Sequence, residues 1–309
     1  PGTKTFVQPA VVAPVVEQVA ATGAKPFLTD TAVLYRSPRD NAVGHARVAL
    51  DHGFTPEAVG CSFISADGLN GGDDVEVPIE GGKHFDAVAL ASVIMQSRSM
   101  LVLSHATGHL ATGLGGALKN LGMGCASKRG KLRMHHGQHP RIDPDACTGC
   151  ATCAEWCPSD AIAVSDVAVI DRDGCIGCGE CVAVCRDDAV KFDWSINGRQ
   201  LQERTVEYAA ALVRAKPGRI GYVTVAQNIT KDCDCLGVAQ PPLLEDIGIL
   251  ASRDPVAIDK AVLDLVAERA GRSLEAMSYP RVDAHDQIRH AEALGLGDSR
   301  VDLIEIPPA

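Results

Sequence analysis

Hydrophobic and polar residues alternate along the first hundred residues with the periods of both helices and strands. Apolar residues at helical spacing predict helices over 11–21, 42–53 and 87–98. Short apolar runs predict strands over 25–29, 59–65, 74–79 and 99–104. Strands that alternate with helices in this way are typical of an α/β domain.

The same alternation resumes after residue 194. It predicts helices over 205–215 and 255–270, and strands over 219–225 and 246–251. Pro255 lies in the first turn of the last helix and Gly271 follows its end, the usual places for these residues. These two helices and two strands are too few to form a hydrophobic core of their own.

We therefore predict one α/β domain, with a mixed or parallel sheet and flanking helices, in two parts. Residues 1–140 form the first part and residues 195–309 the second, and residues 141–194 are an insertion between them. Three consecutive domains are the alternative.

The insertion contains one cysteine pattern twice, and this pattern is the strongest chemical signal in the chain. Its spacing is that of bacterial-type ferredoxins with two [4Fe-4S] clusters, in which the fourth cysteine of each run binds the other cluster. An α+β ferredoxin-like domain is therefore expected here. One predicted ligand set is Cys147, Cys150, Cys153 and Cys185, and the other is Cys175, Cys178, Cys181 and Cys157.

Two other uses of paired cysteines fit this spacing less well. A zinc ribbon needs two CxxC pairs that are well separated, whereas here four cysteines fall close together twice, and Pro158 follows the first run. Disulfides are not expected, because a chain of 309 residues can form a full core without them. Arg186 follows Cys185 where proline would be usual, and its charge could raise the potential of one cluster.

Composition narrows the class of protein without naming a reaction. The chain is 46% hydrophobic and 22% charged, which is typical of a globular protein, and no segment approaches the length of a membrane span. No secretory signal is visible. The twelve cysteines predict a reducing cytoplasm. The net charge of -10 argues against nucleic-acid binding.

A second informative segment, 104–131, has the sequence SHATGHLATGLGGALKNLGMGCASKRGK. Its seven glycines could bring backbone amides close to an anion, although it matches neither a Walker A nor a dinucleotide fingerprint. His105 and His109 lie four residues apart, which would place both on one helical face as a metal pair or as acid and base. Close packing and local hydrogen bonds are the equally weighted alternative. Lys119 and Lys131 are candidate anion ligands, although a single lysine is more often a solvated surface charge.

Four cysteines lie outside the two runs. Cys233 and Cys235 form the segment Asp-Cys-Asp-Cys, which would present two thiols together to a metal or a cluster. Cys125 would be a third ligand if its loop met theirs at the strand ends. Cys61 is expected to be a core residue. Asp30, Asp254 and Asp259 could lie at the same strand ends, although helix capping is the commoner use of such aspartates.

Several of these segments together resemble the DUF362 family of iron-sulfur proteins. They are KPFLTDTAVLYRSPRDNAV, the glycine-rich segment, the double cysteine run, DCDC and DIGILASRDPVAID, and the resemblance covers nearly the whole chain. It implies an α/β domain that carries an inserted two-cluster ferredoxin. It implies no reaction, because the family name records an unknown function.

Together these features predict a cytoplasmic iron-sulfur protein that transfers electrons at low potential and exchanges them with a redox partner protein. The α/β domain could make it an oxidoreductase, with a small anionic substrate bound by Lys119 and Lys131, protons from His105 or His109, and a third metal centre or cluster at Cys125, Cys233 and Cys235. The alternatives are a non-enzymatic ferredoxin-like carrier and an iron-sulfur sensor or metal-delivery factor.

Overall fold

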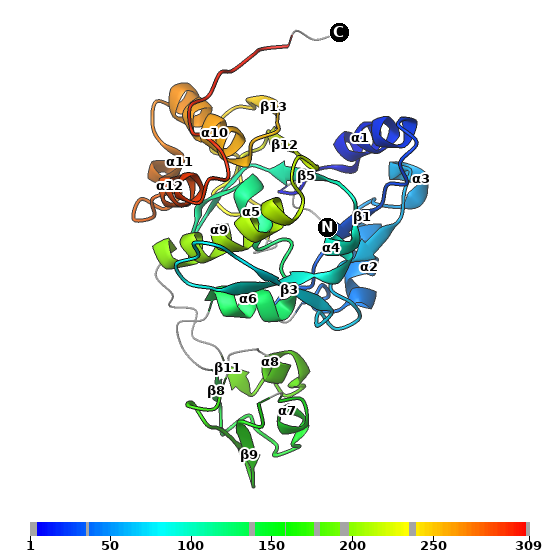
Figure 1. Ribbon diagram of the computed structural model, residues 1–309, viewed down its shortest axis with the longest axis vertical. Helices are drawn as coiled ribbons and strands as arrows, with labels where there is room; N and C mark the ends of the chain where they lie inside the picture. Colours follow the sequence, from blue (N-terminus) through cyan, green and yellow to red (C-terminus); the bar gives the residue numbers. More distant parts are fainter. Residues whose placement is uncertain are drawn as a thin grey trace.

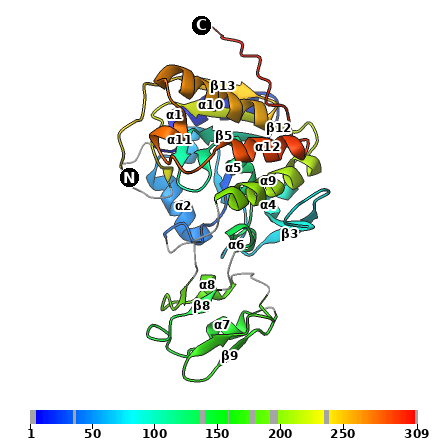
Figure 2. The ribbon, with the colours of Figure 1, turned by 90° about the vertical axis from the view of Figure 1, so that its left-hand side faces the viewer.

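A computed structural model describes residues 5–34, 37–135, 140–157, 159–175, 180–191, 198–234 and 239–306. Both views show residues 140–191 as a small body apart from the rest of the chain (Figures 1 and 2). This small body has a hydrophobic cluster of its own, separate from the two clusters of the larger body. Within the described ranges, no helix is both long and apolar enough to cross a lipid bilayer.

The central sheet of the larger body joins strands from both sides of the small body. Its order is β13 (Gly248–Ser252), β12 (Ile220–Ala226) and β5 (Met100–His105). β12 runs parallel to β5 and antiparallel to β13, so the sheet is mixed. The three strands that the apolar runs predict are thus confirmed. Residues before 140 and after 198 share one sheet.

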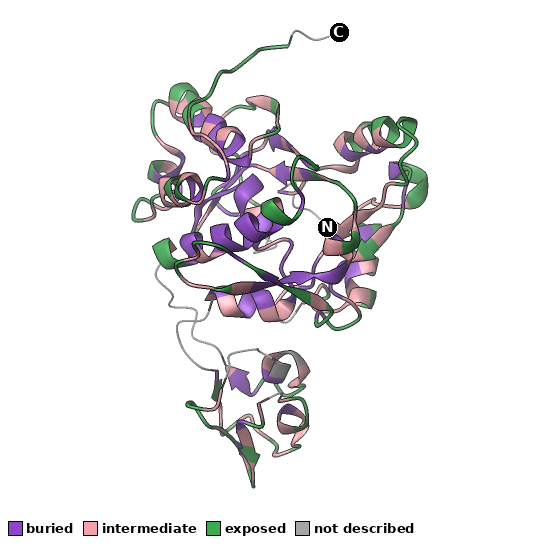
Figure 3. Ribbon diagram, viewed as in Figure 1, coloured by how far each residue is buried: buried purple, intermediate pink, exposed green. Residues whose placement is uncertain are grey.

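Two helices, α5 (Ala117–Gly122) and α10 (Pro255–Ala270), pack on this sheet. Three more, α9 (Gly198–Ala215), α11 (Leu274–Met277) and α12 (His285–Ala293), pack against these two or against each other around the main core. Figure 3 shows α5 and α9 as largely buried. α10 has the predicted bounds, and Gly271 ends it in the left-handed conformation with φ 67°. Glycine adopts this conformation without the steric cost that a Cβ brings.

A hairpin corrects one prediction. The expected helix over 87–98 is wrong in its first half, because β4 (Ala87–Ala91) pairs antiparallel with β3 (Asp74–Pro78) and only α4 (Ser92–Gln96) is helical. Four of the five residues of β4 are buried. A short apolar run that is buried on both faces has no period that distinguishes a strand from a helix.

The N-terminal residues form a smaller unit around parallel strands β1 (Leu28–Asp30) and β2 (Phe63–Ser65). The helices α1 (Pro9–Ala21), α2 (Ala42–Asp51) and α3 (Pro56–Val59) accompany them. Val12, Val16, Val59 and Cys61 form its hydrophobic cluster, as expected for Cys61. The strand expected from residue 59 begins only at Phe63, because α3 ends at Val59 and Gly60 turns with φ 80°.

The small body repeats one unit twice. The first half contains β8 (Arg141–Ile142), α7 (Thr152–Glu155) and β9 (Ile162–Val164), and the second contains β10 (Ala168–Ile170), α8 (Glu180–Val184) and β11 (Val190–Lys191). β8 pairs with β11, and β9 pairs with β10, both antiparallel. Asp160 and Asp188, equivalent in the two halves, have positive φ values of 51° and 52°. The two cysteine runs therefore occupy matching positions.

Asp254 and Asp259 cap helices, as their residue type suggested. Asp254 is the N-cap of α10 and accepts hydrogen bonds from the amides of Val256 and Ala257. Asp259 is fully buried and accepts the amides of Ala117 and Leu118, at 2.7 and 2.9 Å, at the start of α5. Neither aspartate belongs to the site described below.

The burial of Asp259 predicts a pH dependence of stability. Burial raises its pKa from 3.8 to about 7 although two amides donate to it. The stability that its protonated form contributes is present below pH 4 and is lost as the pH rises towards 7. Between pH 5 and 7, the free energy of unfolding should fall by about 1.4 kcal/mol per pH unit from this group. Urea unfolding followed by circular dichroism would measure this slope, and Asp259→Asn should remove it. If the variant kept the slope, the pH dependence would come from other groups.

Candidate functional site

Four cysteines of the small body lie together around one pocket. This pocket is lined by Cys147, Cys150 and Cys153 from the first run and by Cys185 from the second. These four are the residues of the first predicted ligand set. The geometry therefore brings the last cysteine of one run to the first three of the other.

Backbone amides point at three of the cysteine sulfurs. The amide of Ala168 donates to Cys147 Sγ at 3.4 Å. The amides of Ala161 and Ala189 donate to Cys157 Sγ and Cys185 Sγ, each at 3.3 Å and each four residues after the cysteine. Amide donors stabilise negative charge on cluster sulfurs and tune their potential. The donors thus fit an iron-sulfur cluster, and those from Ala161 and Ala189 are equivalent in the two halves of the body.

The turn between Cys147 and Cys150 depends on a glycine. Gly149 has φ 65°, and a Cβ on it would lie 2.6 Å from the carbonyl oxygen of Asp166. Of the second predicted ligand set, Cys181 is buried, and Cys157 and Cys175 are partly buried. Cys178 lies outside the described residues.

A second group of polar residues lies in the larger body, where parallel strands end. His105 is the last residue of β5, and the loop after β12 leads to Cys233. Asp30 is the last residue of β1, and Asp67 follows β2. The carboxyl ends of parallel strands are the usual place for ligand sites in α/β proteins.

The glycine-rich segment does not form the helix that would pair its histidines. His105 ends β5, and His109 ends β6 (Thr107–His109), which forms a hairpin with β7 (Gly113–Gly115). The expectation of one helical face is therefore wrong. His105 Nε2 donates to the carbonyl oxygen of Gln227 at 2.7 Å, so this ring is held by the loop after β12.

Cys233 meets two of the predicted residues. Lys119 Nζ on α5 donates to Cys233 Sγ at 3.7 Å, and the His109 side chain is hydrogen-bonded to Cys233. His109 Nδ1 accepts the amides of Ala111 and Thr112 at 3.2 and 3.1 Å, so the neutral ring carries its proton on Nε2. The glycine-rich segment and the Asp-Cys-Asp-Cys segment therefore meet at Cys233. We call His109, Lys119 and Cys233 the thiol cluster.

Burial and positive charge keep the nearby histidines neutral. Burial lowers the pKa of His109, and the Lys119 ammonium lowers it further. Burial also lowers the pKa of His135, on α6 (Lys128–His135), to about 4, with added repulsion from His109 and Lys119. At neutral pH, these uncharged rings can each donate one hydrogen bond and accept another.

Lys131 lies in a different environment from Lys119. It is buried, and its Nζ donates to Thr31 Oγ1 at 2.5 Å and to the carbonyl oxygen of Ala32 at 2.6 Å. Burial lowers its pKa although Asp30 and Asp67 oppose this shift. Lys131 therefore joins α6 to the end of β1 through hydrogen bonds within the protein.

An ion pair links the two regions. Arg39 lies 3.5 Å from the carboxylate of Asp234, next to Cys233. Burial raises the pKa of Asp234, and the positive charge of Arg39 opposes this shift. The N-terminal unit thus contacts the loop that carries Cys233.

Cys125 belongs to the main hydrophobic core, with Leu90, Leu118 and Leu121. Burial raises the pKa of its thiol to about 12, and its charged neighbours are Asp30, Lys131 and Lys216. Cys235 lies outside the described residues.

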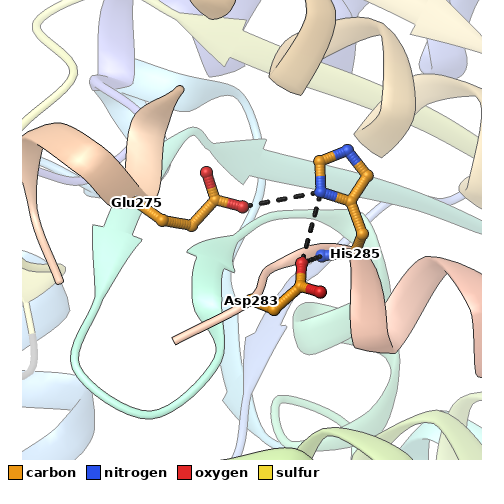
Figure 4. A group of neighbouring side chains, drawn as sticks. All are labelled: Glu275, Asp283 and His285. Carbon is orange, nitrogen blue, oxygen red and sulfur yellow. Dashed lines mark hydrogen bonds and ion pairs between the residues drawn. The ribbon is translucent and has the colours of Figure 1, made fainter. Parts of the chain in front are cut away.

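A third group, which the sequence did not suggest, contains Glu275, Asp283 and His285 (Figure 4). His285 Nδ1 lies 3.5 Å from Glu275 Oε1 and 3.4 Å from Asp283 Oδ1. The hydrogen bond to Glu275 raises the pKa of His285, and Arg289 pairs with the other oxygen of Asp283. The four side chains form one network of ion pairs and hydrogen bonds. Their uneven spacing along the chain gives no sequence signal.

Comparison with known proteins finds one family. The family described as "Domain of unknown function (DUF362)" matches residues 1–264. No curated protein and no solved structure matches the chain. The matched range includes the small body and the thiol cluster, whereas Glu275, Asp283 and His285 lie beyond it.

Proposed function

Since this chain belongs to the DUF362 family, whose description records no activity, we propose from its cysteines that it is an iron-sulfur electron-transfer protein. The small body would hold two [4Fe-4S] clusters in a ferredoxin-like domain. The larger body would make it a low-potential redox enzyme or the redox subunit of one. Twelve cysteines, none needed for a disulfide, favour a reducing cytoplasm.

The observation that carries this proposal is the pocket lined by Cys147, Cys150, Cys153 and Cys185. A zinc site formed by neighbouring CxxC pairs would not require a ligand from the other run, whereas the two-cluster ferredoxin pattern does. Three amide donors to cysteine sulfurs support the same reading, because a cluster with thiolate ligands carries negative charge.

Electrons would enter or leave through the exposed side of the small body. Cys150 is exposed at the pocket, beside Thr148 and Asp187, so a partner could approach this cluster closely. A redox partner protein that serves as donor or acceptor is therefore part of the proposal. Two neighbouring clusters with matching surroundings would transfer single electrons between them.

The thiol cluster is the best candidate for the place where the electrons reach a substrate. Lys119 could hold a small anionic substrate, and His109 could supply a proton to the reduced product. His105 and Lys131 have less support in these roles, because His105 Nε2 donates to Gln227 and Lys131 donates to Thr31 and Ala32. A third cluster that includes Cys125 also has little support, because Cys125 is buried in the main core.

Two other functions remain as alternatives from different classes. A ferredoxin-like carrier would use the larger body only to dock partners, and it would exchange electrons without turnover. A sensor or metal-delivery factor would hold a labile metal at Cys233 and Cys235. The position of Lys119 next to Cys233 argues against this last function, because a fixed ammonium repels a metal cation.

Iron and sulfide analysis of anaerobically purified protein tests the proposal. We expect about eight irons and eight sulfides per chain, both in the wild type and in the Cys233→Ser, Cys235→Ser double variant. Two zinc ions per chain in place of iron would refute the electron-transfer function. If the wild type contained more than eight irons per chain and the double variant only about eight, the difference would establish a third centre in the larger body.

A further inference from the structure

We propose that Cys233 is a nucleophilic cysteine whose site accepts a small carboxylic acid with an electrophilic carbon. This inference goes beyond electron transfer, because it concerns the larger body alone and does not require a loaded cluster. It rests on the contacts of the thiol cluster and on the way the surrounding loop is held.

The sulfur of Cys233 receives donors from two sides. Lys119 Nζ donates to Sγ at 3.7 Å. Because His109 Nδ1 already accepts two backbone amides, Nε2 is the ring atom left to donate to Cys233. Both donors stabilise the thiolate, which is the form of the cysteine that attacks carbon. A cysteine next to a lysine and a histidine is the usual environment of a reactive thiol.

The loop that carries Cys233 is fixed from several sides. The amide of Gly108 donates to the carbonyl oxygen of Thr230 at 2.8 Å. A Cβ on Gly108 would lie 2.4 Å from the carbonyl oxygen of Lys231, so only glycine allows this approach. Asp232 accepts the hydroxyl of Tyr279, and its amide donates to Gln240. The nucleophile is thus held on a rigid backbone, as reactive groups require.

Cys233 is nevertheless within reach of a small molecule, because it is only partly buried. The charges around it favour an anionic substituent. Lys119 directs its ammonium at the sulfur, whereas Lys231 lies over the ring of Tyr279, 4.7 Å from its centroid. Of the two aspartates that flank Cys233, Asp234 is paired with Arg39 and Asp232 accepts the hydroxyl of Tyr279. A carboxylate on the electrophile would therefore be attracted to Lys119.

The bond changes are simple for a displacement. A bond forms between Sγ and the electrophilic carbon, the bond from that carbon to its leaving group breaks, and the leaving group departs with the electron pair. The thiol proton passes to water. No oxidant or reductant takes part.

Alkylation with two matched probes tests the site. Iodoacetate and iodoacetamide differ in charge and both release iodide, so their rate ratio at one pH reports the field at the sulfur. The full-length protein, purified anaerobically, would be alkylated, and fragment ions would assign each product to residue 233 or 235. We expect the iodoacetate to iodoacetamide ratio at Cys233 to exceed that of free cysteine about tenfold, the effect of one ion pair in a partly buried site.

Two lysine variants test whether the charge of Lys119 causes the preference for iodoacetate. Lys119→Met should lower the ratio about tenfold, and Lys231→Met, its matched control on the same loop as Cys233, should leave it unchanged. If Lys119→Met loses its helical circular dichroism signal, the wild-type ratio at low and at 1 M salt decides instead, because salt screens the ammonium. A ratio equal to that of free cysteine, no alkylation of Cys233 by either probe, or a ratio insensitive to both salt and Lys119 would overturn the proposal. Since iron content does not enter this measurement, its failure is distinct from failure of the electron-transfer function.

Discussion

Replacing Cys185 with alanine should lower the iron content of the anaerobically purified protein from about eight to about four atoms per chain. Cys185 lies with Cys147, Cys150 and Cys153 around one pocket, although it belongs to the second cysteine run. Its loss should therefore remove the cluster of the first run and leave that of the second. The amide of Ala189, which donates to Cys185 Sγ, would lose its acceptor in the same change.

Matched variants make this result specific. Cys153→Ala should remove the same cluster as Cys185→Ala, so the EPR spectra of the two variants should agree. Cys157→Ala should remove the other cluster and give a different spectrum. Cys61→Ala is the control, because Cys61 packs against Val12 and Val16 in the N-terminal unit. A Cys157→Ala spectrum that matches Cys153→Ala, with a different spectrum for Cys185→Ala, would show that the runs do not exchange their fourth cysteines.

Replacing Glu207 with alanine should destabilise the larger body by about 3 kcal/mol. Glu207 is fully buried on α9 and accepts the amides of Lys83, His84 and Phe85 at 3.0 to 3.1 Å. Burial opposes its ionisation, yet the hydrogen bonds from His290 and from these amides hold its pKa below the ordinary value. Without the carboxylate, three amides between β3 and β4 would lose their acceptor.

Urea unfolding followed by circular dichroism would measure the loss. Glu207→Gln should lower the free energy of unfolding less than Glu207→Ala does, because the glutamine amide oxygen can still accept hydrogen bonds. Glu268→Ala is the control, since Glu268 is an exposed helical glutamate on α10, and it should change stability by less than about 0.5 kcal/mol. Equal stability of Glu207→Ala and Glu268→Ala would mean that water replaces the lost contacts.

Sequence reasoning succeeded where local signals and burial agree. α10 has its predicted bounds because Asp254 caps its start, Pro255 occupies its first turn and Gly271 ends it. It failed at 87–91, where residues buried in a hairpin show no period. The four-residue spacing of His105 and His109 suggested one helical face, but the chain forms strands there. Each histidine is therefore the last residue of a strand.

Long-range contacts set the rest of the larger-body site. The sequence left open whether the glycine-rich segment and the Asp-Cys-Asp-Cys segment meet, and in the structure Lys119 contacts Cys233. It could not show that Lys131, in the same segment, would turn to Thr31 in the N-terminal unit. Nor could it show that Cys125 would enter the core, because a cysteine suits a buried apolar position as well as a metal site.

Low-temperature EPR of the dithionite-reduced protein tests the central claim most directly. The account predicts fast-relaxing signals that integrate to about two spins per chain, broadened by magnetic coupling between two neighbouring [4Fe-4S] clusters. A protein that gives no such signal and contains about two zinc ions per chain would contradict it.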